Sequence, residues 1–514
     1  MTTTGTAMER LRQHLHTTRL QGSIHSTLYY DQNTVLPVEG VTWRGEQLAL
    51  LACQLHERQS SEAYAELVAE AEASLDADAG PETRRNLMLL RRELERQRCL
   101  DPDLVGRLAQ AQAQGYAIWQ VARRAANFHV FAPALAELLN LRREEAAQLA
   151  LADRAMGDPP RSRWETLAQR FEPGISEQLL EDLFSPLSER LPELIRMVQE
   201  RRAGSGASAV NHSWDLAEQV QDDLCRQLLE EWGFDPRRCR RDRSPHPFSC
   251  TLGPQDFRIT TRVVAAQPFS AFLATAHEWG HSLYEQGLPR GDDHWFPWPL
   301  GEATSMAVHE SQSLFLECRL ARSEAFAARW HPRFQGALGA DPWGGAAGFW
   351  RQLNPMRPGL IRVEADELGY ALHIVLRYEL ERALLEKELP VADLPAVWNR
   401  RMVELLGVRP GNDAEGCLQD VHWSEGLFGY FPSYAVGHLV SAQLAEAMER
   451  DLGPIEERLR RGEDQTVFDW LAERVWPLGR SVEAGELVER VSGAPLTAVP
   501  FLTYLEGKLE RLAG

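Results

Sequence analysis

The feature that most constrains the fold is a helical hydrophobic periodicity that runs from about Met8 to Arg202. Leu, Ala and Met recur every three to four residues with charged residues between them, as in residues 44–75 and 82–100. This spacing places the apolar side chains on one face of an α-helix. Breaks rich in Gly, Pro and Ser at residues 76–82, 157–162 and 203–208 favour short loops. We therefore expect one large, mainly α domain over residues 1–514, with a helical part at about 1–202.

Composition excludes several classes of function for this chain. Lys and Arg number 55 against 74 Asp and Glu, a net charge of −19 that opposes attraction to nucleic acid or anionic lipid. No stretch approaches the roughly 18 apolar residues of a membrane span, and the N-terminal sequence lacks the apolar segment of a secretory signal. The 7 cysteines include no CxxC pair, which argues against a disulfide framework and a Cys-ligated zinc site. We predict a cytoplasmic protein that binds neither nucleic acid nor membranes.

A second part, at about residues 244–440, begins with a strand that leads into a helix. The segment 257–264 (FRITTRVV) alternates β-branched and aromatic residues with Arg and Thr, which predicts a strand. We expect this strand to accept an extended substrate by edge pairing. Residues 269–286 then read as a helix, with Pro268 near the first turn and Gly287 as its C-terminal cap.

That helix contains an HExxH motif from His277 to His281. Residues four apart on a helix lie about 40° and about 6 Å from each other, so both imidazoles can reach one ion. Glu278 faces the open coordination position, where water would bind. The pattern is typical of a catalytic zinc site, although two structural histidines would also fit it.

A catalytic zinc ion takes three protein ligands and keeps one open position. Residues 301–319 form another expected helix and offer Glu302, Glu310 and Glu317 on related turns. A glutamate from a second helix is the usual complement to HExxH in gluzincins. The spacing alone does not choose among these three glutamates.

Five motifs in order resemble those of the carboxypeptidase Taq family of metallocarboxypeptidases, and the resemblance covers nearly the whole chain. They are DxRxT at 256–260, HExxH at 277–281, HESQ at 309–312, IRxxADE at 361–367 and GxxQDxHW at 416–423. The resemblance implies a large helical domain with a deep groove and a small sheet beside the HExxH helix, related in fold to neurolysin and angiotensin-converting enzyme. It also implies that Glu310 is the third ligand, and that the chain forms a homodimer.

The resemblance further implies how peptide hydrolysis proceeds. One Zn²⁺ per chain, for which Co²⁺ could substitute, would activate water, with Glu278 as general base. Related enzymes place a histidine and a tyrosine from the C-terminal region over the metal, which makes His422 and Tyr430 the candidates to stabilise the oxyanion. Tyr434 is a close rival to Tyr430, and a packing role for it is equally compatible with the sequence.

Related gluzincins often carry an acid four residues after the ligand glutamate, where this chain has Leu314. The acid that orients a ligand histidine must then come from elsewhere. We expect it among the acids of IRVEADE (Glu364, Asp366 and Glu367) or from Asp420.

An enzyme that removes one C-terminal residue must also bind a free carboxylate, for which a guanidinium is suited. Arg362 is the first candidate and Arg258 the second; the alternative is a structural ion pair, with Asp366 or Asp256 respectively. The leading hypothesis is a zinc carboxypeptidase of broad specificity that acts on peptides with a free C-terminus. An oligopeptidase that cuts internally and a peptide-binding scaffold without catalysis are the competing hypotheses, and the intact Glu278 argues against the scaffold.

Overall fold

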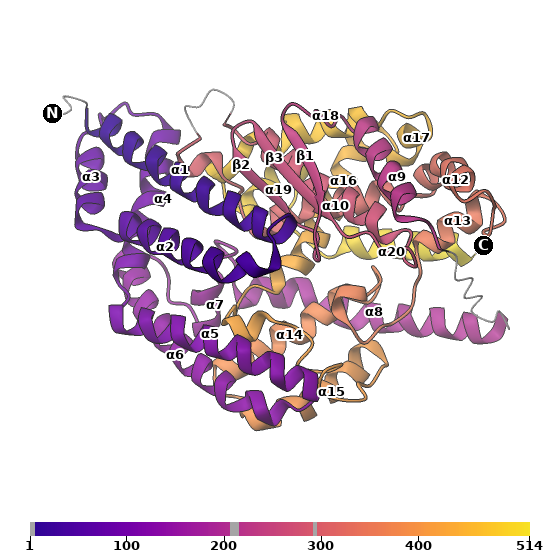
Figure 1. Cartoon of the computed structure of the whole chain (residues 1–514), viewed down its shortest axis with the longest axis horizontal. Helices are drawn as coiled ribbons and strands as arrows, with labels where there is room; N and C mark the ends of the chain where they lie inside the picture. The colour runs from indigo at the N-terminus through magenta and orange to yellow at the C-terminus, as the bar shows by residue number, and fades with distance from the viewer. Residues whose placement is uncertain (1–5, 206–214, 291–295, 514) are drawn as a thin grey trace.

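The computed structural model describes residues 6–205, 215–290 and 296–513, and Figure 1 shows the whole chain. The break expected at 203–208 lies partly outside the described residues. The N-terminal part is helical as the periodicity predicts, and its loops at 74–80 and 156–162 fall where Gly and Pro cluster. Its helices are α1 Ala7–Thr34, α2 Val41–Ser60, α3 Glu62–Ala73, α4 Pro81–Arg98, α5 Pro102–Ala125, α6 Phe128–Ala155, α7 Arg163–Ala168 and α8 Glu177–Ser205.

The rest of the chain adds a small sheet and twelve further α-helices within the described residues. The strands are β1 Cys239–Arg243, β2 Ser249–Gly253 and β3 Asp256–Thr261. The helices are α9 Glu218–Glu231, α10 Ser270–Gly287, α11 Met306–Leu314, α12 Glu324–Leu338, α13 Ala346–Leu353, α14 Tyr370–Leu385, α15 Leu394–Leu406, α16 Pro432–Leu452, α17 Ile455–Arg460, α18 Asp464–Arg474, α19 Ala484–Ser492 and α20 Val499–Ala513. A π-helical segment, η3 Phe315–Ala321, continues α11, and short 3-10 turns include η6 His422–Glu425 and η7 Trp476–Ser481. The expectation of a mainly α fold with a small sheet beside the HExxH helix is confirmed.

The predicted strand is the central strand of the sheet, whose order is β1-β3-β2. β3 pairs in parallel with β1 and antiparallel with β2, so hydrogen-bonded neighbours cover both of its edges. The expectation that β3 accepts a substrate by edge pairing is therefore wrong. β1 has the sequence CRRDR, which carries no strand signal, and its charged side chains are paired instead with acids such as Asp222.

Helix α1 lies beside the sheet (Figure 1) and contacts β2 and β1. Ser23 donates a hydrogen bond to the carbonyl of Leu252 in β2, and the hydroxyl of Tyr30 donates to Asp242 in β1. A cavity of about 530 Å³ lies between α1, β2 and the end of α10, and it reaches His309.

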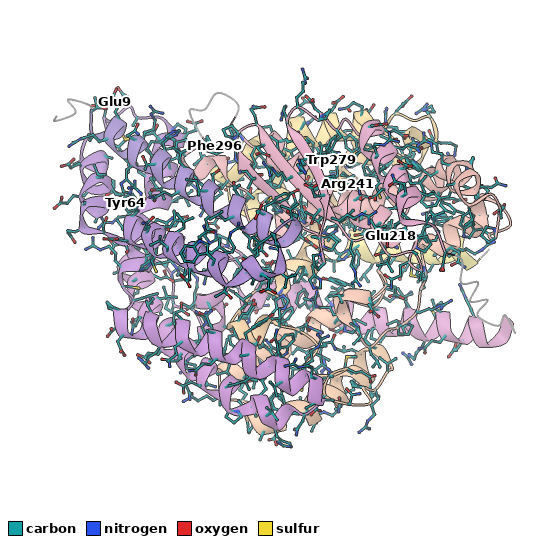
Figure 2. The ribbon with its side chains drawn as sticks, in the orientation of Figure 1. Glu9, Tyr64, Glu218, Arg241, Trp279 and Phe296 are labelled. Atoms are coloured by element: carbon teal, nitrogen blue, oxygen red, sulfur yellow. The ribbon has the colours of Figure 1, made fainter. Side chains whose placement is uncertain are left out.

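Two large hydrophobic cores hold the described parts of the chain together, and a third, small cluster of Leu104, Leu108 and Leu141 joins α5 to α6. The larger core runs from α5 to α20 and includes the fully buried Trp164, Trp279 and Trp330. The smaller one joins α1, α3 and α4 around Tyr64 and Trp298. Figure 2 shows Tyr64 among these N-terminal helices and Trp279 in the part that contains the sheet. Among the helices of the described residues, none combines the length and apolar character needed to span a membrane.

Candidate metal centre

Helix α10 presents His277 and His281 on one face, as the four-residue spacing predicts. Their rings lie 5.0 Å apart between centroids, and both side chains are partly exposed. The opposite face is buried through residues such as Ala276 and Trp279. The helix ends one residue later than predicted, because Gly287 is its last residue, and a Cβ there would lie 2.3 Å from the ring of Trp476.

Helix α11 brings Glu310 to the two histidines. Its Oε2 lies 3.9 Å from Nε2 of His277 and 3.4 Å from Nε2 of His281. One ligand atom from each of the three residues can be chosen so that all lie within 4.8 Å of one another. Tetrahedral ligands at about 2 Å from an ion lie about 3.3 Å apart, so this donor set could hold a metal ion after small side-chain shifts.

Two glycines allow Glu310 to approach the histidines. A Cβ on Gly280, inside the HExxH motif, would lie 2.4 Å from the carbonyl oxygen of Gln312 on α11. A Cβ on Gly437 of α16 would lie 2.9 Å from Cγ of Glu310 itself. The backbones of α10 and α11 are therefore in direct contact at Gly280, and no other residue fits there without separating the helices.

Gly280→Ala should move α11 away from α10 and weaken metal binding about 5- to 100-fold, because overpacking of this kind costs about 1–3 kcal/mol and displaces Glu310. Gly336→Ala in α12 is the matched control, since its Cβ would have nothing within 4 Å. Metal affinity of both variants can be measured by competition with a chromogenic chelator. Equal affinity in Gly280→Ala and the wild type would show that the helix contact does not position Glu310.

The second ring nitrogen of each histidine is also bonded. Nδ1 of His277 lies 3.0 Å from Oε2 of Glu317, and Nδ1 of His281 lies 3.1 Å from the carbonyl oxygen of His309. Arg322 in turn donates two hydrogen bonds to Oε1 of Glu317. Such partners fix the tautomer and the orientation of a ligand histidine.

The expectation that an acid of IRVEADE or Asp420 orients these histidines is therefore wrong. Glu364 is exposed, Asp366 accepts a hydrogen bond from the backbone N–H of Gly369, and Glu367 binds Lys508. Asp420 binds two arginines. Glu317 is the acid that orients a ligand histidine, His277, although the sequence suggested Glu317 only as a possible metal ligand.

The charges of the centre favour a cation. Glu278 is only 7% exposed, and burial, together with Glu310, raises its pKa to about 7 although His277 lowers it. Burial would lower the pKa of His277, yet Glu310 and Glu317 raise it to about 10. Glu310 and Glu317 thus stabilise positive charge at His277, and a divalent cation could take the place of the proton there.

Arg362 lies in a buried network beside this centre. Its Nε donates to Asp420 at 2.9 Å and its Nη1 donates to the hydroxyl of Tyr370 at 3.1 Å. The structural ion pair is thus with Asp420 and not with Asp366. Nη2 makes no hydrogen bond to a described residue. Arg377 donates its Nε to the other oxygen of Asp420 at 2.7 Å and so fixes that carboxylate.

Tyr430, Tyr434 and His422 form a ring cluster next to Arg362. The rings of the two tyrosines lie 5.2 Å apart, and the ring of His422 lies 5.6 Å from that of Tyr430. Burial raises the pKa of both tyrosines, and both also respond to the charges of Glu310 and Arg362. Glu310 also lies against α16, at Gly437, and Arg362 lies against Tyr434 one turn earlier, so the ligand glutamate and the arginine both adjoin this helix.

His422 is neutral near pH 7. Burial lowers its pKa, as do Arg362 and Arg377, and against the opposite effect of Asp420 the pKa falls to about 4. Its buried Nδ1 has no hydrogen-bond partner among the described residues. A neutral imidazole keeps one N–H with which it can donate a hydrogen bond.

Arg258 has a different environment. Its Nε and Nη2 both bind Asp256 at 2.8 Å, and its guanidinium lies 5.0 Å from the centre of the Tyr30 ring. The side of the guanidinium best suited to a carboxylate is therefore occupied. These contacts match the structural ion pair with Asp256 considered above.

Glu172 is a residue that sequence reasoning missed. It is 3% exposed and accepts hydrogen bonds from the backbone N–H of Ala307 and from the hydroxyl of Ser433. Burial raises its pKa to about 7. Glu172 thus joins the start of α11 to the start of α16, and no local motif marks it in the sequence.

The comparisons with known proteins show the family of the chain. A model of the carboxypeptidase Taq (M32) metallopeptidases matches residues 10–509. The chain belongs to the M32 family. Thermostable carboxypeptidase 1 of Thermus thermophilus is 37% identical over 99% of each chain, and carboxypeptidase 1 of Bacillus subtilis is 32% identical over 94% of each.

Solved structures of M32 proteins have the same fold. Metallocarboxypeptidase 1 of Trypanosoma cruzi superposes with a TM-score of 0.92 at 33% identity, and covers 98% of this chain and 99% of its own. The M32 carboxypeptidase of Deinococcus radiodurans gives a TM-score of 0.90 at 32% identity over 99% of both chains. The protein is thus a metallocarboxypeptidase of the M32 family, and a peptide is its class of substrate.

Proposed function

We propose that the protein removes single amino acids from the free C-terminus of peptides, with broad specificity, by zinc-dependent hydrolysis. The observation that carries the proposal is the convergence of His277, His281 and Glu310 beside the buried Glu278. Imidazole nitrogens with one carboxylate are a donor set that suits Zn²⁺, and Co²⁺ could substitute for it. We propose one ion per chain at these three residues.

A bound zinc ion would polarise the scissile carbonyl and lower the pKa of a bound water to about 7. Glu278 then accepts the proton of the attacking water and transfers it to the leaving amine. Its pKa of about 7 supports this role, because a carboxylate that is basic near neutral pH can both take and return a proton. Neutral His422 and the hydroxyl of Tyr430 or Tyr434 would donate hydrogen bonds to the oxyanion.

Arg362 is our candidate for the residue that binds the terminal carboxylate. Asp420 and Tyr370 hold its Nε and Nη1, which leaves Nη2 for the substrate. Its guanidinium lies 5.2 Å from the centre of the Tyr434 ring, so the side chain is held in place from more than one side. Arg258 is the weaker candidate, because Asp256 already occupies its Nε and Nη2.

Peptides with an amidated C-terminus should be cut at least tenfold more slowly than their free-acid twins. A charge-assisted contact in a partly buried groove contributes about 1.5–3 kcal/mol, or one to two decades in kcat/KM. Arg362→Ala should slow only the free acid and so narrow the difference between the two peptides. If the wild-type enzyme cut the free-acid and the amidated peptide at equal rates, the exopeptidase proposal would be refuted. If the difference between the two peptides remained in Arg362→Ala but disappeared in Arg258→Ala, Arg258 would be the residue that binds the terminal carboxylate.

The histidines, Glu278 and Glu310 would also serve an oligopeptidase that cuts internally, but membership of a carboxypeptidase family favours removal of terminal residues. Mass spectrometry of a mixed peptide digest, before and after incubation with the metal-loaded enzyme, separates the two. Ladders that shorten by one residue support the carboxypeptidase, whereas fragments from internal cuts support the oligopeptidase.

We propose that the enzyme is a cytoplasmic homodimer. The seven cysteines are all free, which agrees with a reducing compartment. We expect light scattering at micromolar concentration to give twice the mass of the 58.1 kDa chain. A mass near that of one chain would refute the dimer.

A further inference from the structure

Glu381 in α14 is a buried carboxylate that the proposed reaction does not use. Its side chain is 0% exposed, and it forms no ion pair with a described residue. Burial raises its pKa to about 7, whereas three N–H donors and the charge of Arg377 lower it, which favours the ionised form. A buried carboxylate without an ion pair needs such hydrogen bonds, so its position depends on the groups that donate them.

Two of the three donors come from one loop. Nε1 of Trp423 donates to Oε1 of Glu381 at 2.9 Å, and the backbone N–H of Gly429 donates to Oε2 at 3.0 Å. The third donor is Nε1 of Trp164, which lies 3.3 Å from Oε2 on helix α7, next to α14 (Figure 1). Because all three groups are N–H donors, this position requires a side chain that only accepts hydrogen bonds, as an ionised carboxylate does.

The loop at residues 422–430 carries His422 and Tyr430, two of the residues that we propose as donors to the oxyanion. His422 directly precedes Trp423, and Tyr430 directly follows Gly429. Each end of the loop is therefore bonded to one oxygen of the same carboxylate. The rings of His422 and Tyr430 lie 5.6 Å apart. The two bonds to Glu381 thus fix the backbone positions from which these side chains extend.

Packing limits the space at both ends of the loop but does not join them. Gly429 has a φ of 87°, a conformation that favours glycine, and a Cβ there would lie 2.7 Å from Cα of Ala168 in α7. At the other end, Trp423 is buried and its ring lies 5.9 Å from that of Trp398. The carboxylate of Glu381 is the group that connects the two ends to each other.

We propose that Glu381 is a positioning residue, which holds both ends of the 422–430 loop and thereby places His422 and Tyr430 against the oxyanion. The inference rests on the proposed function, because it presupposes that these two side chains stabilise the oxyanion. Glu381 itself is enclosed in the core, so it acts only through the loop.

Glu381→Gln tests the proposal, because the amide keeps the size of the side chain but turns its NH₂ group toward at least one N–H donor. We expect kcat per metal-loaded chain to fall about 10- to 100-fold, since displaced oxyanion donors lose much of their effect. KM for a free-acid peptide should stay near the wild-type value, because the oxyanion forms only as the transition state is approached.

A phosphinic peptide with a free C-terminus gives a readout that partial unfolding does not imitate, because its tetrahedral phosphorus group mimics the oxyanion. Titration calorimetry of the metal-loaded full chain measures its dissociation constant and its stoichiometry. In Glu381→Gln the dissociation constant should rise by about the factor by which kcat falls, with one peptide still bound per chain. A variant that was only less well folded would bind fewer peptides with the wild-type dissociation constant, and that result would overturn the proposal.

Trp423→Phe and Trp164→Phe form a matched pair. Each removes one indole N–H donor to Glu381 and leaves the carboxylate in place, and both rings are buried. Trp423→Phe should weaken binding of the phosphinic peptide about fivefold, because the loop loses one of its two bonds to the carboxylate. Trp164→Phe should leave that binding unchanged, since Trp164 lies outside the loop. This pair tests the proposal even where Glu381→Gln does not fold.

His422→Ala and Tyr430→Phe test the oxyanion donors separately from Glu381. If His422→Ala weakens binding of the phosphinic peptide while Glu381→Gln and Trp423→Phe bind it as the wild type does, the positioning role is overturned and the proposed function stands. Equal weakening in Trp164→Phe and Trp423→Phe would also overturn it, because the carboxylate would then support the core in general. If neither His422→Ala nor Tyr430→Phe weakens binding, the proposed oxyanion donors are themselves wrong, and the role of Glu381 is overturned with them.

Discussion

Glu278→Gln is expected to lower kcat by about 10²–10⁴-fold while the enzyme keeps its full metal content. The amide has the shape of the carboxylate but cannot accept the proton of the attacking water. The side chain is 7% exposed, and burial raises its pKa to about 7, so the ionised carboxylate is a cost to the folded state near neutral pH. The variant should therefore fold at least as well as the wild type.

Steady-state kinetics on a free-acid peptide, together with metal analysis of the same samples, checks this expectation. Glu278→Asp is a useful companion, because it keeps the basicity and withdraws the carboxylate by one methylene. We expect its activity to lie between those of the wild type and Glu278→Gln. Near-normal turnover in Glu278→Gln would mean that another group acts as the base.

Glu310→Ala should instead lose the metal, with affinity reduced by more than about 100-fold, since even residues that only orient a ligand contribute 10–100-fold. Its carboxylate lies 3.4 Å from Nε2 of His281 and closes the donor set. Glu302→Ala is the control, because Glu302 lies on the same segment but binds Arg480 and Arg19. Metal content measured at limiting zinc should fall in Glu310→Ala alone. Full occupancy in that variant would exclude Glu310 as a ligand.

The sequence predicted the parts of the centre that depend on local geometry. Helical spacing placed His277 and His281 on one face, because four residues are close to one turn. It could not choose the third residue, since Glu302, Glu310 and Glu317 all lie on one segment. The resemblance to a family pointed to Glu310, and the structure places that carboxylate beside the histidines.

Two parts of the structure, the contact of Glu317 with His277 and the strand β1, have no local signal in the sequence. Glu317 reaches His277 from the π-helical segment η3, whose winding differs from the α-helix that we expected over residues 301–319. β1 was missed because its charged residues are paired with acids from α9, which only the tertiary structure brings near. Because β1 pairs with β3, the strand that we expected at an edge of the sheet lies at its centre.

The backbone contact at Gly280 has a thermodynamic consequence. An ion held by His277 and His281 on α10 and by Glu310 on α11 would cross-link two helices that already touch there. Unfolding would have to release that ion, so the free energy of unfolding would increase with the logarithm of the free metal concentration. Thermal stability and catalytic activity would then both depend on one quantity, the chemical potential of the metal in the surrounding solution.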